Sequence, residues 1–210
     1  MVLIVFDVDD TLLETFNHSF EIFEYMAGKK LDKEVFLENY KKENGFEKNL
    51  NYFFANKDIN QIKQQYTSIK AKTDRKIFID KKLFEQLKQR WYKFGILTNW
   101  PGNKTMEKLR QIWFKEGDFE IILHWDNLEY HKPDPRAFEQ VLEKFDSNEV
   151  VYIGDSLDDL RAAQGAGVKF IGVLTWLATL EDFKSKGISE EIIFSDVNKV
   201  LEWLEKNHRK

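Results

Sequence analysis

The chain has 210 residues, of which 42% are hydrophobic and 15% aromatic, enough for one sizeable domain or for a domain with a smaller one inserted. The formal net charge is only -4, so no basic excess points to nucleic acid as a partner. Cysteine is absent, which excludes disulfides, thiol catalysis and the common zinc sites, and the four histidines share no metal-ligand spacing: His18, His124, His131 and His208.

The N-terminal stretch from Val2 to Leu12, VLIVFDVDDTL, is an apolar run that ends abruptly in acidic residues. Such a run predicts a buried strand, with Asp7 and Asp9 leaving the extended chain on the same side. Taken alone, an acidic pair more often marks a solvated strand end. Burying two neighbouring carboxylates is unfavourable unless a cation faces them, so the rest of the chain has to supply that cation.

Residues 15–78 have a different character, because their apolar positions recur at helical spacing and no strong strand pattern appears. This pattern predicts a small helical domain, inserted into a larger domain formed by residues 1–14 and 79–210. We expect the aromatic residues of the insertion, such as Phe16, Phe20 and Phe23, to form its core rather than to bind a cofactor.

From Asp80 onward, helical and strand patterns alternate. The expected helices cover residues 81–92 and about 104–115, with one opened by Pro135 and one beginning near Leu157 and ending by Gly167. The expected strands cover residues 94–98, 119–124, 150–153, 170–174 and 192–194. This alternation predicts an α/β fold: a Rossmann-like parallel sheet with helices on both faces.

In an open parallel sheet, ligands bind beyond the carboxyl ends of the strands, so the residues after each strand form one candidate site. Those residues are acids, hydroxyls, an amide, a lysine and a glycine: Asp7, Asp9, Thr11, Thr98, Asn99, Lys132, Gly154, Asp155, Ser156, Asp158 and Asp159. The carboxylates suit Mg²⁺, which prefers oxygen ligands, and Lys132 and Thr98 suit the oxygens of a phosphate. Together they favour phosphoryl transfer, which depends on positioning and electrostatic stabilisation.

Four motifs at these strand ends resemble those of the haloacid dehalogenase superfamily, the aspartate-nucleophile phosphohydrolases. They are DVDDT at residues 7–11, LTN at 97–99, HKPDP at 131–135 and GDSLDD at 154–159. Each motif is common by itself, whereas the four in order at the right strand ends are specific. The chain looks most similar to phosphoglycolate phosphatase-like members with a type-one helical cap, which implies that residues 15–78 close over the site and set specificity.

The resemblance implies catalytic roles for three residues. Asp7 corresponds to the nucleophile that forms an aspartyl-phosphate, and Asp9 to the general acid/base that protonates the leaving group and then activates water. Lys132 corresponds to the cation that screens Asp7 and stabilises the transferring phosphoryl group. Thr98 and Asn99, together with Lys132, are the expected substrate-binding residues.

The resemblance also implies Mg²⁺ as the cofactor. Its expected protein ligands are Asp7, Asp155 and the main-chain carbonyl of Asp9. Asp159 and Thr11 are expected to support these ligands without binding the metal directly. Two positions depart from the common pattern, and their roles stay open at this stage. Asp10 stands where glycine is frequent, and Trp100 stands where a small residue is common, so that it either packs under the insertion or lines the pocket.

These observations predict a Mg²⁺-dependent phosphatase of small phosphate monoesters, such as phosphoglycolate-like acids or sugar phosphates. Nucleoside monophosphates are the main rival substrates, and a phosphomutase would use the same residues. A 2-haloacid dehalogenase is disfavoured because it does not require Asp9, and a receiver-like regulator is disfavoured because receivers lack a capping insertion. The physiological substrate and the cap residues that select it stay open.

We expect a cytoplasmic monomer or homodimer without nucleic-acid or membrane partners. The apolar region of a secretory signal peptide would not contain the acidic residues Asp7, Asp9 and Asp10. No apolar run in the sequence reaches membrane-spanning length.

Overall fold

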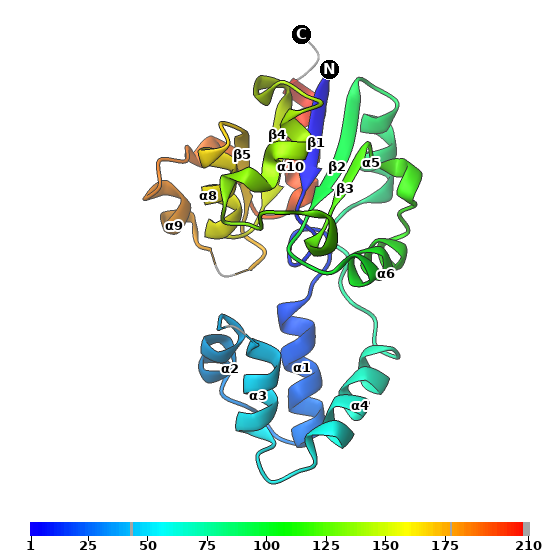
Figure 1. Cartoon of the computed structure of the whole chain (residues 1–210), viewed down its shortest axis with the longest axis vertical. Helices are drawn as coiled ribbons and strands as arrows, with labels where there is room; N and C mark the ends of the chain where they lie inside the picture. The colour runs from blue at the N-terminus through cyan, green and yellow to red at the C-terminus, as the bar shows by residue number, and fades with distance from the viewer. Residues whose placement is uncertain (43, 177, 208–210) are drawn as a thin grey trace. The chain divides into compact units, whose positions relative to one another are not determined.

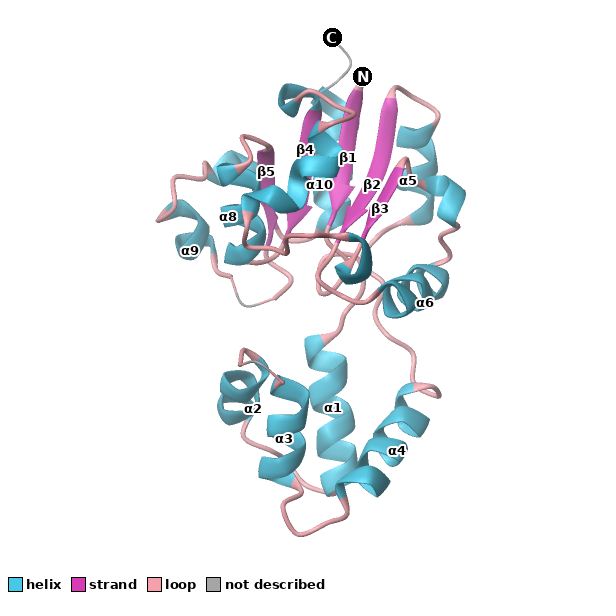
Figure 2. Cartoon of the chain, viewed as in Figure 1, coloured by secondary structure: helices cyan, strands magenta, loops and turns pink. Residues whose placement is uncertain are grey.

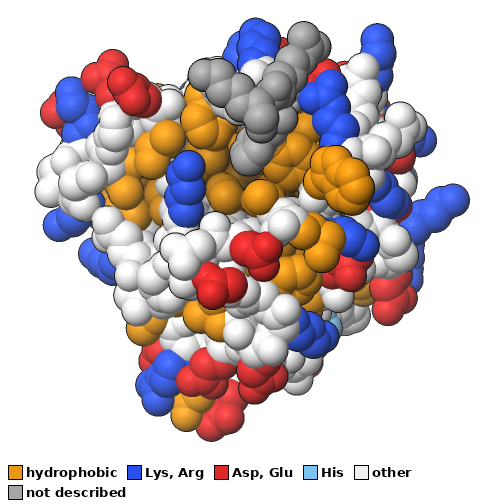
Figure 3. All heavy atoms as spheres, turned by 90° about the horizontal axis from the view of Figure 1, so that it is seen from above, with side chains coloured by type: hydrophobic (Ala, Val, Ile, Leu, Met, Phe, Trp, Pro, Cys, Tyr) orange, Lys and Arg blue, Asp and Glu red, His pale blue; other side chains and the backbone are white. Residues whose placement is uncertain are grey.

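A computed structural model describes residues 1–42, 44–176 and 178–207 of the chain; His208 lies outside this part. The chain divides into two compact units, one formed by Met1–Glu14 with Ile77–Lys210 and the other by Thr15–Lys76. No helix in the described part is both long and apolar enough to cross a membrane. On the face seen in Figure 3, basic and acidic side chains are interspersed, in keeping with the small net charge.

Six parallel strands form the sheet of the larger unit, in the order β3-β2-β1-β4-β5-β6 (Figure 1). The strands are β1 (Val2–Phe6), β2 (Tyr92–Leu97), β3 (Ile121–Leu123), β4 (Val150–Gly154), β5 (Lys169–Val173) and β6 (Ile193–Phe194). The predicted α/β fold with a parallel sheet is therefore confirmed.

Strand β1 is buried on both faces, which explains its continuous apolar sequence. Successive side chains alternate between two hydrophobic cores, with Ile4 and Phe6 in one and Leu3 and Val5 in the other. Helices α5 (Lys81–Lys88), α6 (Gly102–Ile112) and α10 (Val197–Asn207) contribute to the first core, and α7 (Glu139–Leu142), α8 (Leu157–Gly165) and α9 (Leu180–Lys184) to the second. Figure 2 shows α5, α8, α9 and α10 beside the strands.

Several element boundaries differ from those predicted by sequence. The helix expected to reach Tyr92 ends at Lys88, because Tyr92 is the first residue of β2 and lies opposite Val2 in the register. Pro135 opens a short 3₁₀ helix that precedes α7, rather than a regular α-helix. Helix α8 ends at Gly165, before the predicted limit at Gly167, and Gly167 takes the left-handed conformation with φ at 69°.

The smaller unit consists of α1 (Phe16–Ala27), α2 (Lys33–Tyr40), α3 (Gly45–Phe53) and α4 (Ile59–Lys70). Its core is aromatic. The ring of Phe23 is fully buried, and its centroid lies 4.9 Å from that of Phe36, 5.6 Å from that of Phe54 and 5.8 Å from that of Tyr66. Rings from three helices and the segment after α3 therefore meet at Phe23, and the prediction that these residues form a core is confirmed.

We predict that Phe23→Ala lowers the free energy of unfolding by about 3–5 kcal/mol, because it leaves a cavity where these rings meet. Urea unfolding followed by circular dichroism measures the change. Tyr25→Ala on the same helix is the matched control, since Tyr25 is 74% exposed, and it should change the free energy by less than about 0.5 kcal/mol. Equal losses in the two variants would contradict the assignment of Phe23 to the core.

Candidate active site

The candidate site lies where β1 and β4 run side by side in the middle of the sheet. From β1 the sheet continues through β2 to β3 on one side, and from β4 through β5 to β6 on the other. Ligands bind beyond the carboxyl ends of strands at such a switch point. The register places Phe6 opposite Ile153, so Asp7 and Asp155 follow the two strands at nearly the same level. The N–H of Asp7 donates to the carbonyl of Ile153 at 3.0 Å, which continues the sheet pairing to the first acidic residue.

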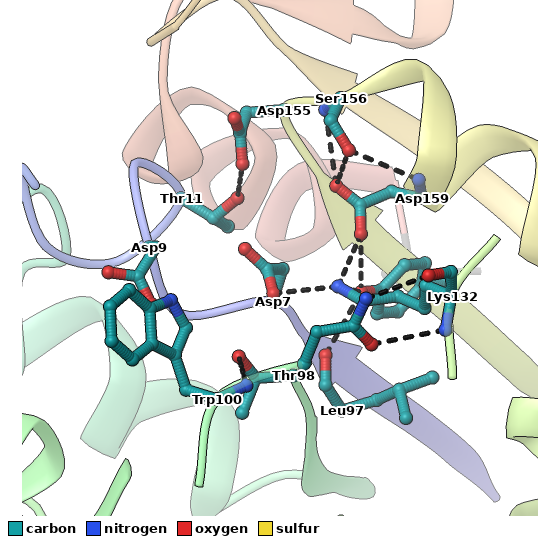
Figure 4. Close-up of polar contacts among 12 residues, drawn as sticks. Asp7, Asp9, Thr11, Leu97, Thr98, Trp100, Lys132, Asp155, Ser156 and Asp159 are labelled. Atoms are coloured by element: carbon teal, nitrogen blue, oxygen red, sulfur yellow. Dashed lines mark hydrogen bonds and ion pairs between the residues drawn. The ribbon is translucent and has the colours of Figure 1, made fainter. Parts of the chain in front are cut away.

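The ammonium of Lys132 lies between Asp7 and Asp159 (Figure 4). Its Nζ donates to Oδ1 of Asp7 at 2.7 Å, to Oδ1 of Asp159 at 2.5 Å and to the hydroxyl of Tyr152 at 2.7 Å. Burial acts to lower the pKa of Lys132, but the carboxylates of Asp159 and Asp7 outweigh burial and raise the pKa above its usual value. The ammonium therefore stays charged in a buried position.

Three buried carboxylates lie close together at this site, and the lysine contacts two of them, Asp7 and Asp159. Asp7, Asp155 and Asp159 each offer an oxygen, and these oxygens lie within 4.8 Å of one another. Burial, opposed by Lys132 and assisted by Asp159 and Asp9, raises the pKa of Asp7 to about 7. Burial, and then Asp159 and Asp7, also raise the pKa of Asp155 well above its usual value. One lysine does not offset three carboxylates, so this donor set fits a further hard cation such as Mg²⁺.

Neighbouring groups hold these carboxylates in place. The hydroxyl of Thr11 donates to Oδ1 of Asp155 at 2.6 Å. Ser156 caps helix α8 and donates to Oδ2 of Asp159 from its hydroxyl at 2.5 Å and from its N–H at 3.1 Å. Gly154 permits the close approach of Asp159, because a Cβ at position 154 would lie 2.7 Å from the Asp159 Cβ.

The residues after β2 support the loop that carries Lys132. The Asn99 side chain donates to the carbonyl of Lys132 at 2.7 Å and accepts from its N–H at 3.1 Å. Thr98 continues the sheet by donating its N–H to Leu123 at 3.0 Å, and its hydroxyl accepts from the N–H of Trp100 at 3.4 Å. The predicted contacts of Thr98 and Asn99 with substrate stay predictions.

The carboxylate of Asp9 has a different partner from that of Asp7. Both of its oxygens accept from Nζ of Lys108 on α6, at 2.5 and 2.6 Å. The ammonium of Lys108 also lies 3.6 Å from the centroid of the Trp100 ring, so Trp100 packs on a charged group of the site. The predicted role of the Asp9 main-chain carbonyl as a metal ligand stays a prediction.

The backbone conformation at Asp10 explains why glycine is frequent at this position. Its φ is 56°, in the left-handed region that asparagine and aspartate tolerate better than most residues. Its N–H donates to the carbonyl of Leu13 at 2.8 Å, and its own carbonyl accepts from the hydroxyl of Thr175. The residue thus shapes the turn that follows Asp9.

Sequence reasoning missed two residues of the site, Tyr152 and Lys108. Tyr152 looked like one more apolar residue of a buried strand, although its hydroxyl contacts Lys132 and Asp159. For Lys108 a signal was present. It shares the buried stripe of α6 with Thr105, Leu109 and Ile112, and a charged residue at such a position needs a buried partner.

Comparisons with known proteins identify the family of the chain. The model of the haloacid dehalogenase-like hydrolase family matches residues 4–173. Among curated proteins, the chain is similar to the pyrophosphatase PpaX of Bacillus mycoides, with 29% identity over 122 residues that cover 56% of this chain and 55% of that protein. It is 32% identical to PpaX of Bacillus cereus over 104 residues, covering 47% and 48% of the two chains. The chain thus matches about half the length of these relatives.

Solved structures share the fold over nearly the whole chain. A Thermotoga maritima protein provisionally named beta-phosphoglucomutase superposes with a TM-score of 0.80 at 21% identity, covering 99% of this chain and 100% of that one. A predicted phosphoglycolate phosphatase from Haemophilus somnus superposes with a TM-score of 0.71 at 19% identity, covering 96% and 97%. The family match spans most of the sequence and includes the strands that carry the site, and the chain therefore belongs to the haloacid dehalogenase-like hydrolase family.

Proposed function

We propose that this protein is a Mg²⁺-dependent phosphatase that hydrolyses small phosphate monoesters through an aspartyl-phosphate on Asp7. The observation that carries the proposal is the buried ammonium of Lys132, which contacts Asp7 and Asp159 beside Asp155. A cation in this position screens a nucleophilic carboxylate from an anionic phosphate. The same cation stabilises the charge that gathers on the phosphoryl oxygens in the transition state.

In the first step, an oxygen of Asp7 attacks the phosphorus atom and the bond from phosphorus to the ester oxygen breaks. The carboxyl group of Asp9 gives its proton to that oxygen, so the alcohol leaves neutral. Asp7 needs no general base, because a carboxylate attacks directly once its negative charge is screened.

In the second step, water hydrolyses the acyl phosphate. Asp9, now a carboxylate, takes a proton from the water while the water oxygen attacks phosphorus. The bond between phosphorus and Asp7 breaks, which releases inorganic phosphate and restores both aspartates.

We further propose that Asp7, Asp155 and the Asp9 carbonyl hold the Mg²⁺, and that Asp159 and Thr11 support these ligands without binding the metal directly. When bound, the metal supplies positive charge that orients the phosphoryl group and offsets its charge. The crowding of three buried carboxylates, and the raised pKa values of Asp7 and Asp155, support a cation here.

The proposed organisation assigns residues 1–14 and 79–210 to the catalytic domain and residues 15–78 to a cap that excludes water during transfer. Phosphoglycolate-like acids and sugar phosphates are the proposed substrates of a cytoplasmic monomer or homodimer. Nucleoside monophosphates are the rival substrates, and inorganic pyrophosphate belongs beside them because curated relatives are named pyrophosphatases.

A phosphate-release assay tests this proposal. The purified full chain is incubated with Mg²⁺ and a panel of these monoesters and pyrophosphate, and free phosphate is measured. Release from at least one monoester supports the proposal. An isomerised sugar phosphate without free phosphate would indicate a phosphomutase, and no turnover of any compound would overturn the proposal.

We predict that Asp7→Asn lowers kcat by more than about 1,000-fold, because an amide cannot form the acyl phosphate. Steady-state phosphate release measures the loss. Asp158→Asn serves as the control, since Asp158 is exposed and pairs with Arg161 on the surface, and it should retain wild-type activity. An active Asp7→Asn enzyme would refute the assignment of the nucleophile.

We also predict that Mg²⁺ raises the unfolding temperature more at about pH 8 than at about pH 5. The pKa of Asp7 rises from 3.8 to about 7 on folding, so metal-free stability falls as pH rises through this range and the folded carboxylate ionises. Above that range, a bound cation offsets the cost of the ionised cluster.

Thermal unfolding with Mg²⁺ or with EDTA at the two pH values measures this difference. Asp155→Asn is the comparison variant, because it removes a proposed ligand and should abolish the effect of Mg²⁺. An equal rise in unfolding temperature at both pH values would contradict the prediction.

A further inference from the structure

Lys108 occupies an unusual place for a lysine. Helix α6 turns one stripe of side chains toward the core, and Lys108 stands in that stripe with Thr105, Leu109 and Ile112. The residue is only 4% exposed. A buried ammonium is tolerated only when charged or polar groups replace its water, so its partners decide what it does.

The ammonium of Lys108 contacts both a carboxylate and an aromatic ring. Its Nζ reaches both oxygens of Asp9, at 2.5 and 2.6 Å, so the contact fixes the plane of the carboxylate as well as its distance. The same Nζ lies 3.6 Å from the centroid of the Trp100 ring, a cation–π distance. Trp100 is itself held, since its carbonyl accepts from the N–H of Trp125 at 2.9 Å.

The two aspartates that begin the site therefore have separate lysines. Lys132 contacts Asp7 and Lys108 contacts Asp9, and the two lysines come from different segments of the chain. Asp9 lies on the loop after β1, where its side chain is 15% exposed, and a short side chain on a loop needs an anchor to keep one direction. Lys108 supplies that anchor from a helix.

We propose that Lys108 is a positioning residue for Asp9. Held over the indole ring of Trp100, its ammonium directs the Asp9 carboxyl group toward the ester oxygen that must receive a proton. This inference rests on the proposed function, because it assigns Lys108 a part in the proton transfer made by Asp9. In this proposal Lys108 acts through Asp9, the carboxylate that it contacts.

The leaving group provides the test. An alkyl phosphate releases an alcohol that needs a proton from Asp9, whereas p-nitrophenyl phosphate releases nitrophenolate, which leaves without one. Lys108→Met removes the ammonium but keeps the length of the side chain. We expect it to lower kcat on the alkyl ester by about 10–100-fold, within the range that general acid catalysis contributes, and to leave KM within about twofold.

The first turnover of p-nitrophenyl phosphate should behave differently. In rapid mixing, Lys108→Met should release its first equivalent of nitrophenolate at a rate within about threefold of wild type, because Asp7 attacks without help from Asp9. Lys104→Met is the matched control, because Lys104 lies one turn earlier on α6, is exposed and pairs with Glu107. This control should match wild type on both substrates.

Several outcomes would overturn the inference: equal losses on the two substrates, a change in KM alone, or full activity of Lys108→Met. If circular dichroism shows that Lys108→Met does not fold, Lys108→Arg and Trp100→Leu are compared with wild type on the same two substrates. Lys108→Arg should recover most of kcat on the alkyl ester and Trp100→Leu should lose part of it. A wild-type protein inactive on every monoester would instead reject the proposed function, so the two failures are distinguishable.

Discussion

The contact on which the site depends is that of the Lys132 ammonium with the carboxylates of Asp7 and Asp159. Neither partner is tolerable alone in this buried place, because an unpaired charge loses its water without compensation. Together they tie the loop after β3 to the end of β1 and to the first turn of α8. The rim of the site is thus held by the same charges that are proposed to do chemistry, and its three buried carboxylates could hold a metal ion.

The surrounding hydrogen bonds show how the fold supports this charged centre. Thr11 and Asn99 join other segments to the site by holding Asp155 and the main chain of Lys132, and Ser156 holds Asp159 within the first turn of α8. The carboxyl ends of adjacent parallel strands bring these segments together, which is why the site forms at the switch point of the sheet. Positioning of this kind matters in phosphoryl transfer, where placement of charge does most of the work.

Asp7 and Asp9 are two residues apart, yet their surroundings differ sharply. Asp7 is buried among carboxylates, with its charge balanced in part by Lys132, and Asp9 meets a lysine that lies over an indole ring. Two chemically identical side chains acquire distinct tasks when their environments diverge in this way. The left-handed backbone of Asp10 then turns the chain directly after Asp9.

The sequence by itself determined the family, the parallel α/β fold, the helical character of residues 15–78 and the set of polar residues at the strand ends. These features are local: periodicity marks helices and strands, and motifs recur at strand ends whatever the packing. Tertiary structure alone decided that Tyr92 begins a strand, that Asn99 supports Lys132, that Tyr152 belongs to the site and that Lys108 meets Asp9. Each of these is a contact between segments far apart in the chain, and only the packing of strands and helices sets which side chains meet across such distances.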